Sequence, residues 1–158
     1  MAKAEIKIEG IQRLQERLWR KYKVMTGYLD QALLQVCEEA VTYSKEHKGY
    51  KDRTSNLKNS ISFALFFDGQ LIRMVEGRIP KPEERPNGQN EVRANLEGYC
   101  NQPGVVAPKG YSLVIAAGMD YGKYVEARGY NVVYMTKYYL VDELHKAVRD
   151  ALEVAREV

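Results

Sequence analysis

The chain has 158 residues, and 24 lysines and arginines against 21 aspartates and glutamates leave a formal net charge of +3. A chain of this length can bury roughly two-thirds of its unfolded surface in one core. The charge is too small to indicate a nucleic-acid partner, and no apolar run reaches the roughly 18 residues that a membrane-spanning helix needs, so we expect one globular domain over residues 1–158 with no membrane contact.

Hydrophobic spacing predicts the helices. Ala4–Glu9 alternates isoleucine with charged residues, which predicts a short edge strand that Gly10 ends. Apolar residues at helical spacing then predict two N-terminal helices, from about Ile11 to Lys23 and from about Thr26 to His47, with Thr26 as the N-cap of the second. A similar stripe predicts a C-terminal helix that begins near Thr136.

The strands follow from a change of period. Ile61–Phe67 alternates apolar and smaller residues, Asp68-Gly69 is a strong hairpin signal, and Gln70–Gly77 forms the return strand. Tyr111–Ala117 predicts a third strand and Asn131–Met135 a fourth. The sequence therefore predicts an α+β fold in which two N-terminal helices and a C-terminal helix pack on a small antiparallel sheet.

Between the second and third strands lies a long hairpin excursion. All five prolines fall between Arg78 and Gly110, so a strand ladder cannot continue through residues 78–110. Only Glu91–Leu96 is compatible with a short helix in this segment. Connections of this length are commonly functional or mobile in compact domains.

No residue pattern indicates catalysis. His47 and His145 lie at a helix end and on a polar helix face, and the chain has no HExxH, CxxC or Gly-x-Ser-x-Gly motif. We expect Cys37 on the apolar side of a helix and Cys100 in a loop, both as structural thiols in a cytoplasmic protein without a secretory signal. We therefore expect no catalytic residue, no metal and no cofactor, and a small hydrolase is the least favoured function.

Tyrosine is unusually frequent, with twelve Tyr against three Phe and one Trp. Six of the tyrosines fall between Tyr121 and Tyr139, close to Gly118, Gly122 and Gly129. Rigid side chains with an apolar ring and a polar tip, placed on a glycine-rich turn, are typical of a recognition surface.

Four stretches carry a family resemblance: Ile8–Leu14 (IEGIQRL), Arg53–Ile61 (RTSNLKNSI), Val114–Gly118 followed by Tyr121–Glu126 (YGKYVE), and Tyr138–Leu140. In this order they resemble the head-tail joining or tail-completion (neck) proteins of long-tailed bacteriophages and prophages, of the gene-ten-like type. The second is similar to that family's R-T-G-x-L-x-x-S-I link, with Ser55 where the family favours Gly. The third is similar to its Y-A-x-Y-V-E-x-G-T turn, with Gly122 where it favours Ala.

The resemblance implies a non-catalytic α+β protein that forms a homo-oligomeric ring between portal, connector and tail tube. Its partners would be other neck and tail proteins, in the bacterial host cytoplasm during assembly and then in the virion. A ring requires a heterologous interface, in which one patch meets a different patch on the neighbour. As a hypothesis, we assign to this interface Tyr121, Tyr124, Glu126, Gly129, Tyr130, Tyr138 and Tyr139.

The alternative is a nucleic-acid-binding module. It would use the basic segment Lys45–Lys58, with tyrosines as stacking platforms for bases. Phosphate binding weakens steeply as salt rises, whereas assembly through tyrosine-rich patches does not, so a salt titration distinguishes the two functions.

Overall fold

The computed structural model describes residues 9–158, so the predicted strand Ala4–Glu9 lies almost wholly outside the described residues. The chain then forms one long helix, α1 (Ile11–Glu46), where the sequence predicted two. The predicted break at Thr26 was wrong, because the apolar stripe stays in phase across this point. Thr26 lies inside α1, and its Oγ1 donates a hydrogen bond to the Tyr22 carbonyl at 3.0 Å instead of capping a helix.

The sheet has three antiparallel strands in the order β2-β1-β3, and it confirms the predicted α+β class. The strands are β1 (Ile61–Phe67), β2 (Gln70–Val75) and β3 (Tyr111–Ala117). At the hairpin between β1 and β2, Asp68 and Gly69 have φ values of 49° and 77°, the two positive values that a type I′ turn requires. The hairpin and the third strand were predicted correctly.

The excursion between β2 and β3 is folded. It contains a 3-10 turn, η1 (Pro82–Glu84), and a helix, α3 (Gly88–Cys100), which is longer than the predicted helix at Glu91–Leu96. The placement of Cys100 in a loop was wrong, because Cys100 ends α3. Three side chains spaced four residues apart are buried on one side of α3: Val92, Leu96 and Cys100. The excursion therefore contributes to the core.

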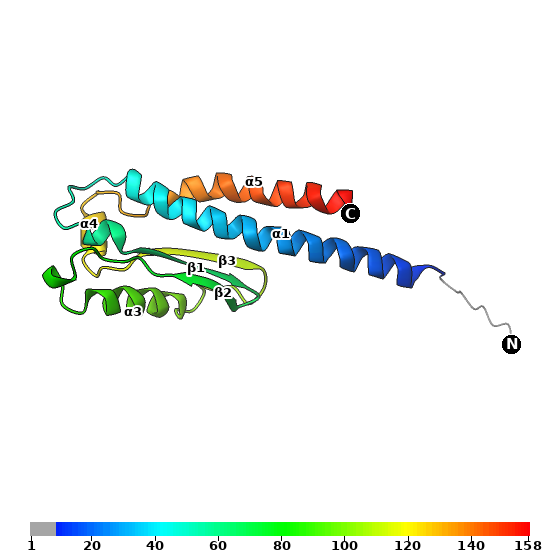
Figure 1. Cartoon of the computed structure of the whole chain (residues 1–158), viewed down its shortest axis with the longest axis horizontal. Helices are drawn as coiled ribbons and strands as arrows, with labels where there is room; N and C mark the ends of the chain where they lie inside the picture. Colours follow the sequence, from blue (N-terminus) through cyan, green and yellow to red (C-terminus); the bar gives the residue numbers. More distant parts are fainter. Residues whose placement is uncertain (1–8) are drawn as a thin grey trace.

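The molecule has three layers (Figure 1). α1 and the antiparallel helix α5 (Thr136–Glu157) cover one face of the sheet, and α3 covers the other. The core under the two long helices comprises Leu29, Leu33, Leu65, Ala147 and Ala151. The core under α3 comprises Ala64, Phe66, Leu96, Cys100 and Val114. Successive residues of β1 thus enter opposite cores, which explains why this central strand is buried on both faces.

Two short helices, α2 (Asn56–Asn59) and α4 (Gly122–Ala127), lie together at one end of the sheet. A third cluster supports them and comprises Leu57, Ile79, Val92, Met119 and Val132. The predicted fourth strand, Asn131–Met135, was wrong: this segment forms turns, because three of its backbone amides bind the side chain of Glu126 and are not available to a strand ladder.

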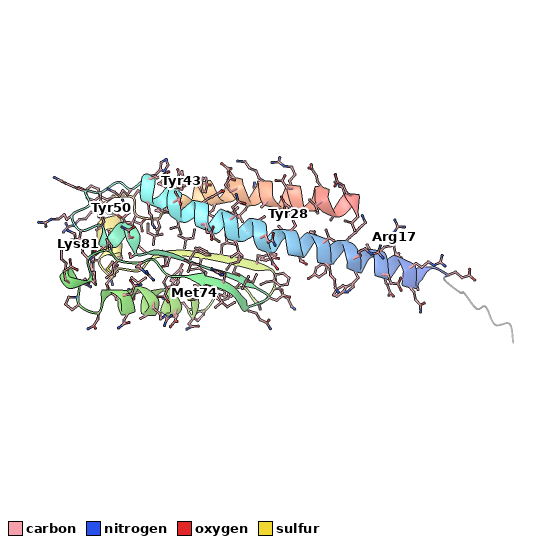
Figure 2. All side chains as sticks on the ribbon, viewed as in Figure 1. Arg17, Tyr28, Tyr43, Tyr50, Met74 and Lys81 are labelled. Carbon is pink, nitrogen blue, oxygen red and sulfur yellow. The ribbon has the colours of Figure 1, made fainter. Side chains whose placement is uncertain are left out.

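At the other end of the molecule, α1 runs past both the sheet and the end of α5 (Figure 1). Near that point the Lys21 Nζ donates to the Ala155 carbonyl at 2.7 Å. Figure 2 shows Arg17 on the projecting part of α1 and Tyr43 at its opposite end. Among residues 9–158, no helix is both long and apolar enough to cross a membrane.

Candidate functional site

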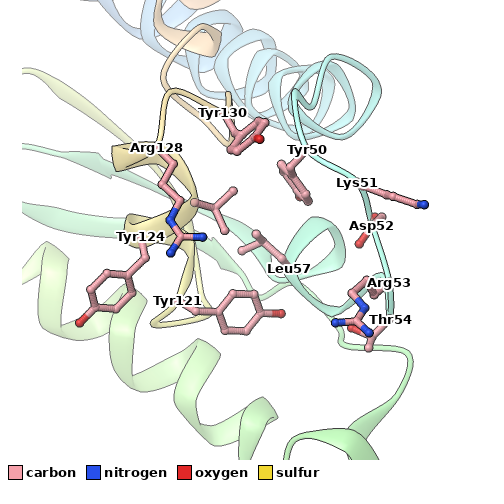
Figure 3. Close-up of a pocket in the computed structure, with 11 residues that line it drawn as sticks. Tyr50, Lys51, Asp52, Arg53, Thr54, Leu57, Tyr121, Tyr124, Arg128 and Tyr130 are labelled. Carbon is pink, nitrogen blue, oxygen red and sulfur yellow. The ribbon is translucent and has the colours of Figure 1, made fainter.

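A pocket of about 670 Å³ opens at the end of the sheet where α2 and α4 lie (Figure 3). One wall is the segment Tyr50–Leu57, which follows α1, and the other is the segment Tyr121–Tyr130, which contains α4. Four tyrosines line the pocket: Tyr50, Tyr121, Tyr124 and Tyr130. Leu57 and Val125 add apolar surface, and Lys51, Arg53 and Arg128 add exposed positive charge.

The two walls are joined at Gly49. Its N–H donates to the Asn131 carbonyl at 2.9 Å, and the Asn131 Nδ2 donates in return to the His47 carbonyl at 2.9 Å. A Cβ atom on Gly49 would lie 2.8 Å from the Asn131 backbone nitrogen, so only glycine permits this approach. The segment that leaves α1 is thus held against the loop that leads into α5.

The first wall is ordered by α2. Ser55 has a φ of 62° and precedes this single helical turn, and Thr54 Oγ1 accepts a hydrogen bond from the Asn56 N–H at 3.2 Å. The buried Asn56 side chain makes two bonds to Lys81, as donor to its carbonyl at 2.9 Å and as acceptor from its N–H at 3.0 Å. Leu57 is buried beneath the turn. The turn that carries it is held by a local bond, at Thr54, and by the two bonds to Lys81.

The tyrosines of the second wall differ in burial. Tyr121 is half-buried, and its ring centroid lies 5.6 Å from the guanidinium of Arg85. Burial raises the pKa of Tyr121, while Arg85 acts in the opposite direction. Tyr124 and Tyr130 are 63% and 49% exposed. The adjacent Gly122 permits close packing, because a Cβ there would lie 3.1 Å from Leu57 Cδ1.

Two buried polar atoms at the pocket have no hydrogen-bond partner among the described residues: Tyr50 Oη and Asp52 Oδ2. Burial, followed by the nearby Asp52 carboxylate, raises the pKa of Tyr50, so the phenol is neutral at physiological pH. An unsatisfied buried polar atom costs about 1–3 kcal/mol relative to a bonded one.

Glu126, which the sequence analysis assigned to an interface, instead binds the loop that follows α4. Its Oε1 accepts hydrogen bonds from the N–H groups of Val132, Val133 and Tyr134 at 3.3, 3.0 and 2.7 Å. Gly129, with a φ of 84°, turns the chain between these groups. Glu126 therefore holds the loop that carries Tyr130 in place.

Tyr138 and Tyr139 lie outside the pocket, at the start of α5. The exposed Tyr138 ring lies 6.4 Å from Tyr134, with the Lys137 Nζ 4.9 Å from the Tyr138 centroid. Tyr139 stacks on Tyr43 of α1 at 4.5 Å, in a separate groove. The structure thus brings Tyr121, Tyr124 and Tyr130 together but not these two tyrosines.

Sequence reasoning missed Tyr50 and Arg128 as pocket residues. Tyr50 follows Gly49 and shortly precedes the Arg53–Ile61 stretch, which was the only available signal. Within residues 9–158, no group of three or more His, Cys, Asp or Glu side chains is arranged to hold a metal ion. Cys37 is buried as predicted, and burial raises the pKa of its thiol to about 12.

Comparisons of this chain with protein-family models, with curated proteins and with solved structures find no match. The function is therefore inferred from the geometry of the pocket and from the motifs that form it.

Proposed function

We propose that this chain is a structural virion-assembly protein of a phage or prophage, which joins the head or connector to the tail through ring-type protein contacts and has no catalytic role. One observation carries the proposal. Two of the stretches that resemble neck proteins, Arg53–Ile61 and Tyr121–Glu126, are far apart in the sequence yet contribute opposite walls of one pocket. A shared location gives both motifs a common role in contacting a partner.

The conformation of Ser55 supports the same proposal. Its φ of 62° lies in the left-handed region, which glycine adopts without the steric cost that a Cβ atom imposes. Glycine is the residue that the neck proteins favour at this place in the R-T-G-x-L motif. A local structure shared with the neck proteins would explain why Ser55 has a left-handed backbone at the position where their motif has glycine.

The composition of the pocket suits a protein partner. Tyrosine and arginine are enriched where protein interfaces concentrate their binding energy, and both line this pocket around an apolar surface. We infer that a side chain or short segment of a neighbouring subunit or neck protein enters here.

The basic segment Lys45–Lys58 is less suited to nucleic acid than its sequence suggests. Lys45 is half-buried, and burial followed by the nearby Lys58 lowers its pKa. The Lys48 Nζ donates to the Tyr50 carbonyl at 3.0 Å. Because part of its positive charge is buried or bonded, the segment does not present a continuous stripe to phosphates. Salt-dependent binding to an oligonucleotide at physiological ionic strength would favour this alternative.

Disruption of the gene in its source phage or prophage tests the proposal. We expect lysates with separate filled heads and tails in electron micrographs, and the chain itself in wild-type virions. A wild-type copy should restore joined particles and infectivity, whereas Tyr124→Ala should not. Tyr99→Ala, which removes an exposed tyrosine of α3 outside the pocket, is the matched control. Joined, infectious particles in the absence of the protein would refute the proposal.

A further inference from the structure

The projecting part of α1, residues Ile11–Lys23, carries an apolar stripe that no other described residue covers. We call this segment the α1 arm. Its five large apolar side chains are 41% to 59% exposed, and they are Ile11, Leu14, Leu18, Trp19 and Tyr22. By helical spacing they continue the side of α1 that is buried further along at Leu29 and Leu33. The apolar side of α1 that packs in the core under the two long helices therefore continues along the arm, where it is exposed.

The charge of the α1 arm limits what can cover it. The arm has five cations and one carboxylate, and within residues 9–158 Arg13, Arg17 and Arg20 form no salt bridge. Two arms packed against each other would bring like charges together. The tyrosine-lined pocket is also unsuitable, because Lys51, Arg53 and Arg128 would repel the arm. The arm needs a surface that combines aromatic or apolar side chains with negative charge.

Such a surface lies at the other end of the same helix layer. A groove of about 400 Å³ between α1 and α5, which we call the acidic groove, is lined by Glu38, Glu39, Thr42, Tyr43, Glu46 and Tyr139. Its two tyrosines stack at 4.5 Å, and its carboxylates form no salt bridge among the described residues. The acidic groove offers negative charge beside an aromatic pair, as the arm requires.

We propose that the α1 arm of one copy docks in the acidic groove of a second copy of this chain. Arg20 and Lys23 face carboxylates of the neighbour, and Trp19 and Tyr22 cover the Tyr43–Tyr139 stack. Lys23 already lies beside Trp19, with its Nζ 5.6 Å from the ring centroid. The contact joins two different patches, so a pair of copies still has one free groove and one free arm. Repetition of the contact then closes a ring or extends a filament. This inference deepens the proposed function: closure of the contacts into a ring rests on that function. The contact between two copies can be measured without it.

Charge reversal on each side, followed by mixing, tests this contact. Arg20→Glu/Lys23→Glu removes the net positive charge of the arm, and Glu38→Arg/Glu46→Arg makes the groove basic. Each variant alone should therefore associate at least about tenfold more weakly than wild type. An equimolar mixture lets the unchanged arm of one variant meet the unchanged groove of the other, and should recover association. Sedimentation velocity over a concentration series measures both effects.

Trp19 is the only tryptophan, so its fluorescence reports on the arm directly. We expect its emission to shift to shorter wavelength as wild-type protein associates, and to remain unshifted in each variant alone. Arg73→Glu/Arg78→Glu makes the same charge change at exposed positions away from arm and groove, and should associate like wild type. Circular dichroism confirms that the variants are folded.

Three results would overturn the proposal: a wild-type protein that stays monomeric at every concentration, variants that associate individually as wild type does, or a mixture that does not recover. A Trp19 shift on addition of anionic phospholipid vesicles, without any shift on self-association, would assign the α1 arm to a membrane surface instead. Self-association by this contact in a protein that does not join heads to tails would refute the proposed function and leave the contact standing.

Discussion

Replacement of Glu126 by alanine should destabilise the folded chain. One carboxylate oxygen accepts hydrogen bonds from three consecutive N–H groups, at Val132, Val133 and Tyr134, and alanine leaves all three without that acceptor. The side chain of Val132 is fully buried, so its part of the loop cannot simply move into water. The substitution therefore affects the pocket wall that carries Tyr130 as well as the core beneath it.

The expected cost follows from these contacts. A hydrogen bond to a charged group contributes about 1.5–3 kcal/mol, and the bond at Tyr134 can be partly replaced by water because that residue is exposed. We expect Glu126→Ala to lower the free energy of unfolding by about 2–4 kcal/mol. Glu126→Gln keeps an acceptor oxygen without its charge and should cost about half as much. For a chain of this size, alanine should lower Tm by roughly 4–15 °C.

Urea denaturation followed by circular dichroism measures these differences, with thermal melting as a second measurement. Tyr124→Ala is the control, because this neighbouring side chain is 63% exposed and its loss should change stability by less than about 0.5 kcal/mol. If Glu126→Ala is as stable as Tyr124→Ala, the hydrogen bonds to the loop do not support the fold. Glu126 would then be available for the interface to which its motif assigns it.

Three further substitutions or modifications have expected outcomes. Ser55→Gly should raise the free energy of unfolding by about 0.5–1 kcal/mol in urea titrations, because the left-handed backbone at this residue disfavours a Cβ atom; a loss of stability would contradict this. Gly118→Ala should cost about 2–3 kcal/mol, because its Cβ would lie 2.8 Å from Val92 Cα, whereas Gly98→Ala in open space should stabilise α3 by up to about 1 kcal/mol. With its pKa raised from 9.0 to about 12, the Cys37 thiol stays protonated at pH 8 and should form about a thousandfold less thiolate than an ordinary cysteine. Mass mapping after alkylation should find Cys37 unmodified until urea unfolds the chain. Rapid labelling of the folded chain would refute its burial.

The elements with a strong local pattern were predicted well. Ile61–Phe67 and the Asp68-Gly69 turn follow from residue alternation and turn chemistry, which act over a few neighbouring residues. The continuity of α1 was missed because Thr26-Gly27 looks like a helix boundary, yet the apolar stripe on both sides has one phase. A single helical glycine costs about 1 kcal/mol relative to alanine, and packing of the long helix on α5 and the sheet outweighs it.

The helix α3 was underestimated for a related reason. Prolines and glycines dominate its surroundings, but Val92, Leu96 and Cys100 already have the four-residue spacing of a buried helix side. The predicted strand Asn131–Met135 failed because its amides bind the side chain of Glu126, six to eight residues earlier. Residue alternation within the segment does not reveal that contact.

The candidate site was predicted in part. The glycine-rich turn with its tyrosines does form one wall of a pocket, because its motif is local and its spacing is that of a short helix. The opposite wall could not be predicted to lie there, since it depends on the close approach of Gly49 to Asn131. Tyr138 and Tyr139 are tyrosines like those of the turn, but they lie outside the pocket because they belong to α5.

The insertion of α3 between two strands of the sheet has a consequence for the order of folding. β1 pairs with β2 across a two-residue turn, a step that takes microseconds in isolated hairpins, whereas β3 must return across the whole excursion to pair Phe67 with Tyr111. Each doubling of a closing loop costs about 0.6 kcal/mol of chain entropy. A helix formed early within the excursion shortens the effective loop and brings apolar residues to the hairpin, so we expect the hairpin and α3 to associate before β3 completes the sheet.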